Sequence, residues 1–532
     1  MNMNTSPTPF TILALSAFGQ GSGTAGSLKM IDVHQGSLDD AVAALSGTLS
    51  IPVPREICPA GSVIFSPTAL KDFRPREIVK RISYLRNLAD AGKYIETAAV
   101  GGNSDSQIAQ GLKTQWPDLP IDFRAASASP KEPRASHTAV DDILSMVAMP
   151  GGSGAGARSG QSGAKAWKEQ IDSVTARVLE AVFNHAPFRS LEASWRGVEI
   201  LVSQGPVKEA EGIVLKCAPI DGDMLGEALD SLSPGLADAP PNLILIDHAF
   251  DNTPAAIALL EKVAEFASTL LVPVVVWLGP WFFHLDTWNA LKKLPYLNHY
   301  LEDAAYAKWR KLKKHPGSDW LVMTANRFLV RASYGNDNPP RTVCFSEQHP
   351  LWVSPVWALG TLVGKSVTAW GWPTRFTDYR NISLEDLAAG EFAGEGSAST
   401  ETVFSEDRIL QMVEAGITPL TGALKKDFAL VPKETTLSGG SLKFQLFFNR
   451  IVGYLFYLKE VMGNAALQAD PGARLAVALA ELFRQTGHQP PEDLSIRADP
   501  AEEGKPTLLR IAFTPPVSIL PGTEPLQFTL TW

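Results

Sequence analysis

Two glycine-rich segments have the residue types that hold phosphate groups in nucleotide-binding proteins. Residues 21–26 (GSGTAG) match the GxGxxG pattern after an apolar run, and residues 360–366 (GTLVGKS) resemble a Walker A loop. The first segment is followed by LKMIDVHQ, which has no helical pattern, although a dinucleotide-binding turn must open into a helix. The second has three residues between its glycines where a Walker A loop has four. We therefore interpret the first as a loop between strands and the second as part of a helix.

Other arrangements that carry chemistry are missing from the sequence. Asp247 ends a predicted strand, as a Walker B carboxylate would, but it has no phosphate cradle to work with. The nine histidines form no HExxH motif, and no GxSxG motif is present. Cys58, Cys217 and Cys344 lie more than a hundred residues apart, which fits neither a disulfide framework nor a zinc site. We predict no catalytic residue, no cofactor and no metal site, in a protein of a reducing, cytoplasmic compartment.

Composition sets the broad class of the protein. The chain has 532 residues, 45% of them hydrophobic and 19% charged, which indicates a globular protein of several domains. The net charge of −9, without a basic cluster, argues against nucleic-acid binding. Residues 266–283 carry no charge, but Pro273, Gly279 and Pro280 interrupt them, so we predict no stable membrane insertion. No Lys or Arg precedes the first apolar segment, so we expect no secretory signal.

The pattern of elements predicts an α/β fold in two units joined by a linker. Residues 149–165 (MPGGSGAGARSGQSGAK) have the composition of a flexible linker, and residues 141–149 (DDILSMVAM) form a short apolar helix candidate before it. We therefore predict a domain at 1–124, a linker with its helix at 125–165, and a larger domain at 166–532. The expected elements are a strand at 10–15 and a helix at 71–94 in the first unit. The second unit has helices at 171–185, 351–359 and 443–461, strands at 198–202, 212–216, 508–513 and 525–532, and a βαβ unit at 243–247, 253–267 and 271–278.

Several dispersed segments of the second unit resemble one family, the large contractile-sheath subunit of type VI secretion systems. The resemblance is carried by residues 188–202 (FRSLEASWRGVEILV) and continues through LILIDHAF and LLVPVVVW. It recurs in residues 306–334, where Trp309 and Arg310 precede MTANRFLVRASYG, and in FSEQHPLW, VTAWGW, STETVFSEDRILQMVEAGITPL and NRIVGYLFYLKEVMG. Residues 373–381 (PTRFTDYRN) replace the glycine cluster expected there, so the resemblance does not extend to the contacts of that loop.

The first unit is similar to the small sheath subunit. The similar parts are a strand ending in Phe18 and Gly19, SLDDAVAAL, and VIFSPTALKDFRPREIVKRISYLRNL. The chain thus resembles a fusion of two sheath subunits that are usually separate.

The resemblance implies a mechanical function: a homo-oligomeric helical sheath of stacked six-fold rings, around an inner tube and on a baseplate, contracts to drive the tube into a target cell. It implies that terminal strands are donated to neighbouring subunits, with Phe10, Ile12, Leu13, Leu526, Phe528 and Leu530 as candidates. It also implies that an AAA+ unfoldase recognises Ile143, Leu144, Met146 and Val147. The alternative is a nucleotide-dependent α/β enzyme that uses the two glycine-rich segments.

Overall fold

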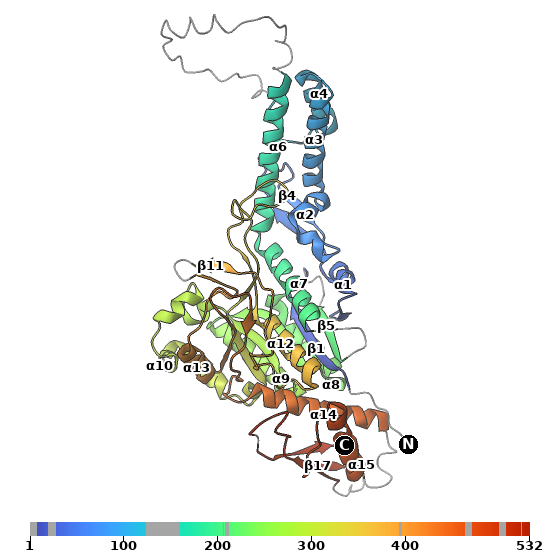
Figure 1. The fold of residues 1–532 in the computed structure, drawn as a ribbon, viewed down its shortest axis with the longest axis vertical. Coiled ribbons are helices and arrows are strands. Elements are labelled where there is room, and N and C mark those ends of the chain that lie inside the picture. The colour runs from blue at the N-terminus through green and yellow to red at the C-terminus, as the bar shows by residue number, and fades with distance from the viewer. Residues whose placement is uncertain are drawn as a thin grey trace, which may run out of the picture.

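The computed structural model describes residues 8–19, 28–123, 160–205, 207, 212–392, 396–462, 471–498, 507–522 and 524–532. Figure 1 shows an elongated α/β molecule with three parts. A body built on a sheet lies in the middle, a stalk of helices rises from one end, and a smaller layer of helices and strands closes the other. The α/β class expected from the sequence is confirmed.

The body is built on a seven-stranded sheet in which only one strand is antiparallel. Its order is β13-β8-β7-β6-β1-β5-β2, and only β2 runs against its neighbour. The strands are β1 (Phe10–Ser16), β2 (Ile31–Val33), β5 (Ile213–Pro219), β6 (Leu243–Phe250), β7 (Val274–Leu278), β8 (Leu321–Ala325) and β13 (Ile417–Pro419).

The predicted βαβ unit is confirmed. α9 (Pro254–Leu270) joins β6 to β7, which pair in parallel. The side chain of Thr253 caps the helix by accepting a hydrogen bond from the Ala256 amide at 3.3 Å, and Leu271 ends it in the left-handed region at φ 55°. The apolar stretch 266–283 is therefore divided between a helix end, a buried strand and a 3-10 helix, η4 (Pro280–Phe283). Within the described residues, no helix has the length and apolar composition needed to cross a bilayer.

The first predicted unit does not have a core of its own. β1 lies between β5 and β6, with Phe10 opposite Ile213 and Ile12 opposite Leu243, so it is a central strand of the main sheet. One hydrophobic core contains side chains from both 1–124 and 166–532. The predicted boundary thus does not separate two packed bodies. Of the predicted linker, residues 125–159 lie outside the described residues, whereas residues 160–165 begin α6 (Gly160–Phe183).

The predicted helix at 71–94 is divided into three pieces. These are the 3-10 helix η1 (Leu70–Phe73), α2 (Pro75–Arg81) and α3 (Ser83–Val100). The prediction of one helix is wrong because Arg74 and Ile82 are extended, with ψ values of 142° and 116°. Ile82 is buried, and the Arg86 guanidinium donates to the Lys80 carbonyl across the break at 2.8 Å. The other elements of this part are α1 (Leu38–Leu45), β3 (Leu49–Pro52), β4 (Ser62–Phe65) and α4 (Asp105–Gln115).

Two further expectations were wrong. Residues 198–202 lie in α7 (Ala186–Gln204) because Trp195, Val198 and Val202 have helical spacing on its buried face. The expected helix at 351–359 is divided, since residues 351–353 pair with β9 (Phe328–Arg331) as β10 (Leu351–Val353) and Pro355 begins α12 (Pro355–Trp370). The body also contains α8 (Leu225–Asp238), α10 (Leu297–Tyr300), α11 (Ala307–Lys313), α13 (Glu406–Glu414), β11 (Gly390–Phe392), β12 (Gly396–Ala398), β14 (Thr421–Gly422), β15 (Ala429–Leu430) and the 3-10 helices η3 (Gly222–Met224), η5 (Trp288–Lys293), η6 (Ala304–Tyr306) and η7 (Pro316–Trp320).

The end of the chain forms a separate layer below the body (Figure 1). α14 (Leu442–Met462) and α15 (Pro471–Gln485) pack on an antiparallel sheet of order β16-β17-β18. Its strands are β16 (Ser495–Ala498), β17 (Leu508–Phe513) and β18 (Leu526–Thr531). The predicted helix at 443–461 and both predicted strands are confirmed.

Candidate functional site: a buried ion network and a free strand edge

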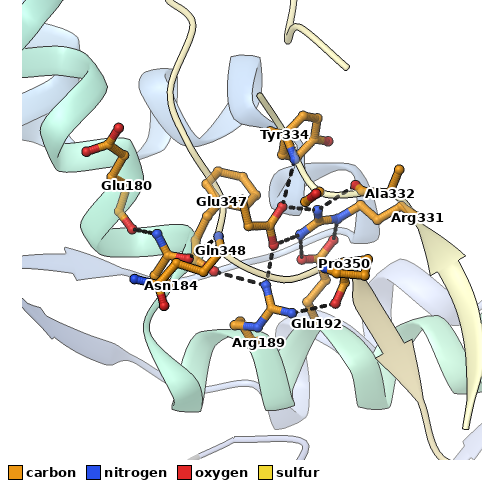
Figure 2. A network of polar contacts seen from close by, with 12 residues as sticks. Glu180, Asn184, Arg189, Glu192, Arg331, Ala332, Tyr334, Glu347, Gln348 and Pro350 are labelled. Carbon is orange, nitrogen blue, oxygen red and sulfur yellow. Dashed lines mark hydrogen bonds and ion pairs between the residues drawn. The ribbon is translucent and has the colours of Figure 1, made fainter. Parts of the chain in front are cut away.

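A network of buried ions joins three distant segments of the chain (Figure 2). Arg331 ends β9 and donates to both oxygens of Glu192 in α7, at 3.1 and 2.8 Å. The same guanidinium donates to Glu347 at 2.5 and 3.1 Å. Arg189, one turn before Glu192, also pairs with Glu347 and donates to the Pro350 carbonyl at 2.7 Å. Two arginines and two carboxylates thus form one hydrogen-bonded cluster.

The cluster is held away from water. The side chains of Glu192 and Glu347 are 1% and 0% exposed, so each needs a counter-charge to remain ionised. Burial lowers the pKa of Arg331, but the two carboxylates outweigh burial and hold this pKa above its ordinary value. The guanidinium also lies over the ring of Tyr334, 4.7 Å from the centroid. Arg331 is therefore a permanent positive charge between two buried negative charges.

Backbone hydrogen bonds fix the loop between β9 and β10 on the same cluster. The Tyr334 amide donates to the Glu347 carboxylate at 3.2 Å, and the Glu347 amide donates to the Tyr334 carbonyl at 2.9 Å. The Gln348 amide donates to the Asn184 side chain at 2.8 Å, just after α6. The network therefore locks the α6–α7 turn, β9 and β10 into one rigid unit. Each of its four charges is paired with an opposite charge inside the cluster.

The sequence analysis named the three segments that carry Glu192, Arg331 and Glu347 as part of the family resemblance, but it assigned no role to these charged residues. A signal was present in α7, where Glu192 occupies an apolar face between Phe188 and Trp195. A carboxylate at such a position predicts a buried partner, but not which arginine supplies it. Arg331 and Glu347 lie more than a hundred residues from Glu192 along the chain, so no local pattern could predict that the three residues form one cluster.

A second set of polar contacts lies at the end of β1, where it meets α7 and β6. The Ser16 hydroxyl lies 2.7 Å from that of Ser194 and donates to Asp247 at 3.0 Å. The Trp357 indole donates to the same Asp247 oxygen at 2.8 Å. Asp247 lies within β6 rather than at its end, and it accepts hydrogen bonds from one strand, β1, and one helix, α12.

The structure confirms that the GTLVGKS segment is helical. Residues 360–366 lie inside α12, where a Cβ on Gly360 would come within 2.6 Å of Leu245. The Lys365 ammonium donates to the Ser383 carbonyl at 2.6 Å, and the Ser366 hydroxyl donates to the Trp372 carbonyl at 2.7 Å. These side chains hold the helix in place and form no phosphate cradle. Residues 21–26 lie outside the described residues, which themselves contain no group of three or more His, Cys, Asp or Glu arranged to hold a metal.

The two predicted terminal strands have different surroundings. Phe10, Ile12 and Leu13 lie in β1, both edges of which are paired within the chain. In this arrangement β1 has no free edge to donate, so this half of the strand-donation expectation does not fit the structure. β18, which holds Leu526, Phe528 and Leu530, pairs with β17 and with no other strand of the described residues.

The direction of the hydrogen bonds identifies the free edge of β18. The Trp532 amide donates to the Thr507 carbonyl at 2.8 Å, toward the β17 side. Because strand amides alternate in direction, those of Gln527, Thr529 and Thr531 point away from β17. The side chains of these three residues are exposed. β18 therefore presents an edge of outward main-chain donors and acceptors, of which the Thr531 carbonyl accepts from the Lys459 ammonium at 3.5 Å. The unfoldase candidates Ile143, Leu144, Met146 and Val147 lie outside the described residues.

Arg450 is an unusual charge in α14. Its side chain is 5% exposed, lies between the rings of Phe10 and Trp372 at 5.8 and 5.6 Å from their centroids, and makes no ion pair with a described residue. Burial lowers the pKa of Arg450 to about 10. Two aromatic faces replace the missing carboxylate.

The central part of the chain matches a known protein family. Residues 236–438 match the family described as "VipB: EvpB/VC_A0108, tail sheath N-terminal domain". This range contains β6, β7, β8, β13 and α12, together with Arg331 and Glu347 of the ion network.

One curated relative is the "Type VI secretion system sheath protein TssC1" of Pseudomonas aeruginosa. The two sequences are 22% identical over 291 residues, which cover 49% of this chain and 58% of that protein. The chain therefore spans less than two thirds of the length of its relative.

Two solved structures were also found. One is described as the anti-feeding prophage baseplate, with a TM-score of 0.34, 12% identity, and coverage of 64% of this chain and 76% of the other. The second is the sheath tail protein Lin1278 from Listeria innocua, with a TM-score of 0.32, 11% identity, and coverage of 61% and 62%.

Proposed function

We propose that this chain, a homologue of the type VI sheath protein TssC1 over about half of its length, is a structural subunit of a contractile injection sheath. It polymerises helically around an inner tube in the cytoplasm and contracts to drive the tube into a target cell. The observation that carries the proposal is the match of residues 236–438 to a tail sheath domain. Subunits of this kind work through contacts between copies, because head-to-tail contacts that do not close produce helical polymers.

We infer that the chain unites the roles of the small and large sheath subunits. The support is the way in which β1 and α1 pack: the Trp195 indole donates to the Ser46 hydroxyl at 2.9 Å, and Phe18 lies 4.7 Å from the Trp195 ring. Contacts of this kind between separate proteins would make an obligate heterodimer. A covalent connection replaces the association step with an intramolecular one.

The partners follow from this role: other copies of the chain, an inner tube protein, a baseplate and an AAA+ unfoldase that recycles the contracted sheath. For the unfoldase, we propose residues 141–149 as the recognition segment. Changing Ile143 and Val147 to Asp should stop disassembly of contracted sheaths but not their assembly. Unchanged turnover of contracted sheaths by the unfoldase would reject this assignment.

We propose further that the free edge of β18 receives or donates a strand at the contact between copies. Thr529→Pro removes one outward amide but leaves the hydrogen bonds to β17 in place, because Thr529 points away from that strand. Thr529→Val is the matched control, since it keeps the amide and favours a strand. We expect the proline variant to remain folded by circular dichroism and to form no tubes by negative-stain electron microscopy. Tubes of normal length from the proline variant would contradict the role of this edge.

The sheath proposal itself is tested by electron microscopy of the single chain, expressed alone and purified without detergent. Hollow striated tubes would establish a subunit that assembles without a second sheath protein. Small monodisperse particles that stay so when the inner tube protein is added would overturn the proposal.

A further inference from the structure

The stalk contains a groove between α3 and α6, which lie side by side (Figure 1). The groove has a volume of about 530 Å³. Its half-buried apolar side chains are Val79 and Ala89 from the α2–α3 side and Val343 from the loop before β10, with the more deeply buried Leu88 and Ile171 beneath them. The lining also includes four charged side chains: Lys93, Glu96, Lys168 and Asp172. Clefts of about 300–1,000 Å³ are large enough to take the side chains of a ligand.

We propose that residues 141–149 (DDILSMVAM) dock in this groove as an amphipathic helix of the same chain. Ile143, Met146 and Val147 have the i, i+3, i+4 spacing by which a helix lays one apolar face into a groove. The proposal concerns an intramolecular contact, so it holds whether or not an unfoldase recognises the segment.

The two ends of the connecting chain lie close to the groove. The Asp122 amide donates to the Gln170 side chain at 2.8 Å, and the Phe123 ring lies 5.6 Å from that of Trp167. The chain thus leaves the described structure beside Gln170, one residue before Ile171 of the groove. It returns at Gly160, the first residue of α6. Both connections to the segment therefore start within a few turns of the proposed docking site.

The spacer on the C-terminal side has the length that this docking needs. Eleven residues of α6 separate Gly160 from Ile171, a rise of about 16–17 Å. The ten residues 150–159 (PGGSGAGARS) have a Gly/Ser-rich composition, for which the root-mean-square span is about 16–19 Å. Effective concentration is highest when the span of a linker matches the distance it must cover, and it reaches the millimolar range. A weak apolar contact is sufficient at such a concentration.

Cys344 provides a direct test, because it lines the groove and is exposed, whereas Cys58 and Cys217 are buried. Met146→Cys introduces a thiol on the docking face of the segment. Under mild oxidation of the full-length chain, we expect an intramolecular disulfide between position 146 and Cys344, found by mass spectrometry of the digested protein. Ser145→Cys is the control, because on a helix it lies opposite the face formed by Ile143, Met146 and Val147. Its connections differ from those of position 146 by one residue, so an undocked chain would cross-link the two positions at the same rate.

We expect cross-linking at position 146 to be at least about tenfold faster than at position 145, in keeping with a local concentration and orientation gained by docking. Adding Ala89→Glu in the groove should remove this difference, because a charge would face the apolar side chains. Asn87→Glu, on the exposed side of α3 and outside the groove, should leave it unchanged. Equal rates at the two positions, or a rate ratio that Ala89→Glu does not change, would overturn the proposal.

Discussion

Replacing Arg331 by Met should destabilise the protein by about 3–5 kcal/mol, the range found when one partner of a buried ion cluster is removed. Arg331 makes four short contacts to Glu192 and Glu347. After the change, Glu347 still has Arg189, but the nearest cation to Glu192 is Arg196, 3.9 Å away in a poor geometry. The cost therefore falls mainly on the orphaned Glu192 carboxylate.

A double-mutant cycle tests this assignment. Adding Glu192→Gln to Arg331→Met removes the orphaned charge, so the double variant should be more stable than the sum of the single changes predicts, by about 2–3 kcal/mol. The measurement is urea unfolding followed by tryptophan fluorescence, with the slope checked for each variant.

The ion pair of Arg327 with Glu401 is a matched control. It is bidentate at 2.9 and 2.6 Å, but its side chains are 30% and 15% exposed. Solvent screening should limit the cost of Arg327→Met to about 1 kcal/mol. A loss below about 1 kcal/mol for Arg331→Met, or strict additivity in the cycle, would refute the reasoning.

Three further changes test the packing and the buried charges in the same assay. Gly197→Ala should lower the free energy of unfolding by about 3 kcal/mol, because the added Cβ would come within 2.4 Å of the Trp357 ring. The control is the same change at the exposed Gly235, which should stabilise α8 by about 0.5–1 kcal/mol. Arg450→Met should stabilise the protein by about 1 kcal/mol at pH 7, since the lowered pKa shows that the fold disfavours this charge at every pH below about 10; a loss of stability would show that the aromatic contacts outweigh burial. Burial lowers the pKa of His248, although Asp247 opposes this, so the unfolded chain takes up a proton first as the pH falls below 6.5. His248→Gln should therefore reduce the loss of stability between pH 7 and 5 by up to about 1.4 kcal/mol per pH unit, and an unchanged pH profile would contradict the assignment.

The sequence predicted those elements whose pattern is local. The alternation in β18, the periodicity of α9 and α14, and the buried runs of β6 and β7 depend on neighbouring residues, and all were confirmed. The prediction of a strand at residues 198–202 was wrong because a short apolar run fits a strand and a buried helix face equally well.

The sites depended on contacts that no local pattern reveals. The position of β1 is determined by pairing with residues about two hundred positions away, and the ion network by the meeting of Glu192, Arg331 and Glu347. Motif spacing could reject the GTLVGKS segment as a phosphate loop, since that test is local. It could not show that α12 holds this segment against β6.

The central place of β1 imposes an order of events during synthesis. Ser16 leaves the ribosome long before β6, and at about 5–20 residues per second the intervening 220 or so residues take roughly 10–45 s. Until β5 is made, late in this interval, the strand FTILALS has neither of its neighbours, so its apolar faces and both backbone edges stay open to other chains. Nascent chains that emerge close together on one messenger would therefore pair wrongly through this strand. We expect a chaperone that binds apolar strands to occupy residues 10–16 until β5 and β6 have been made.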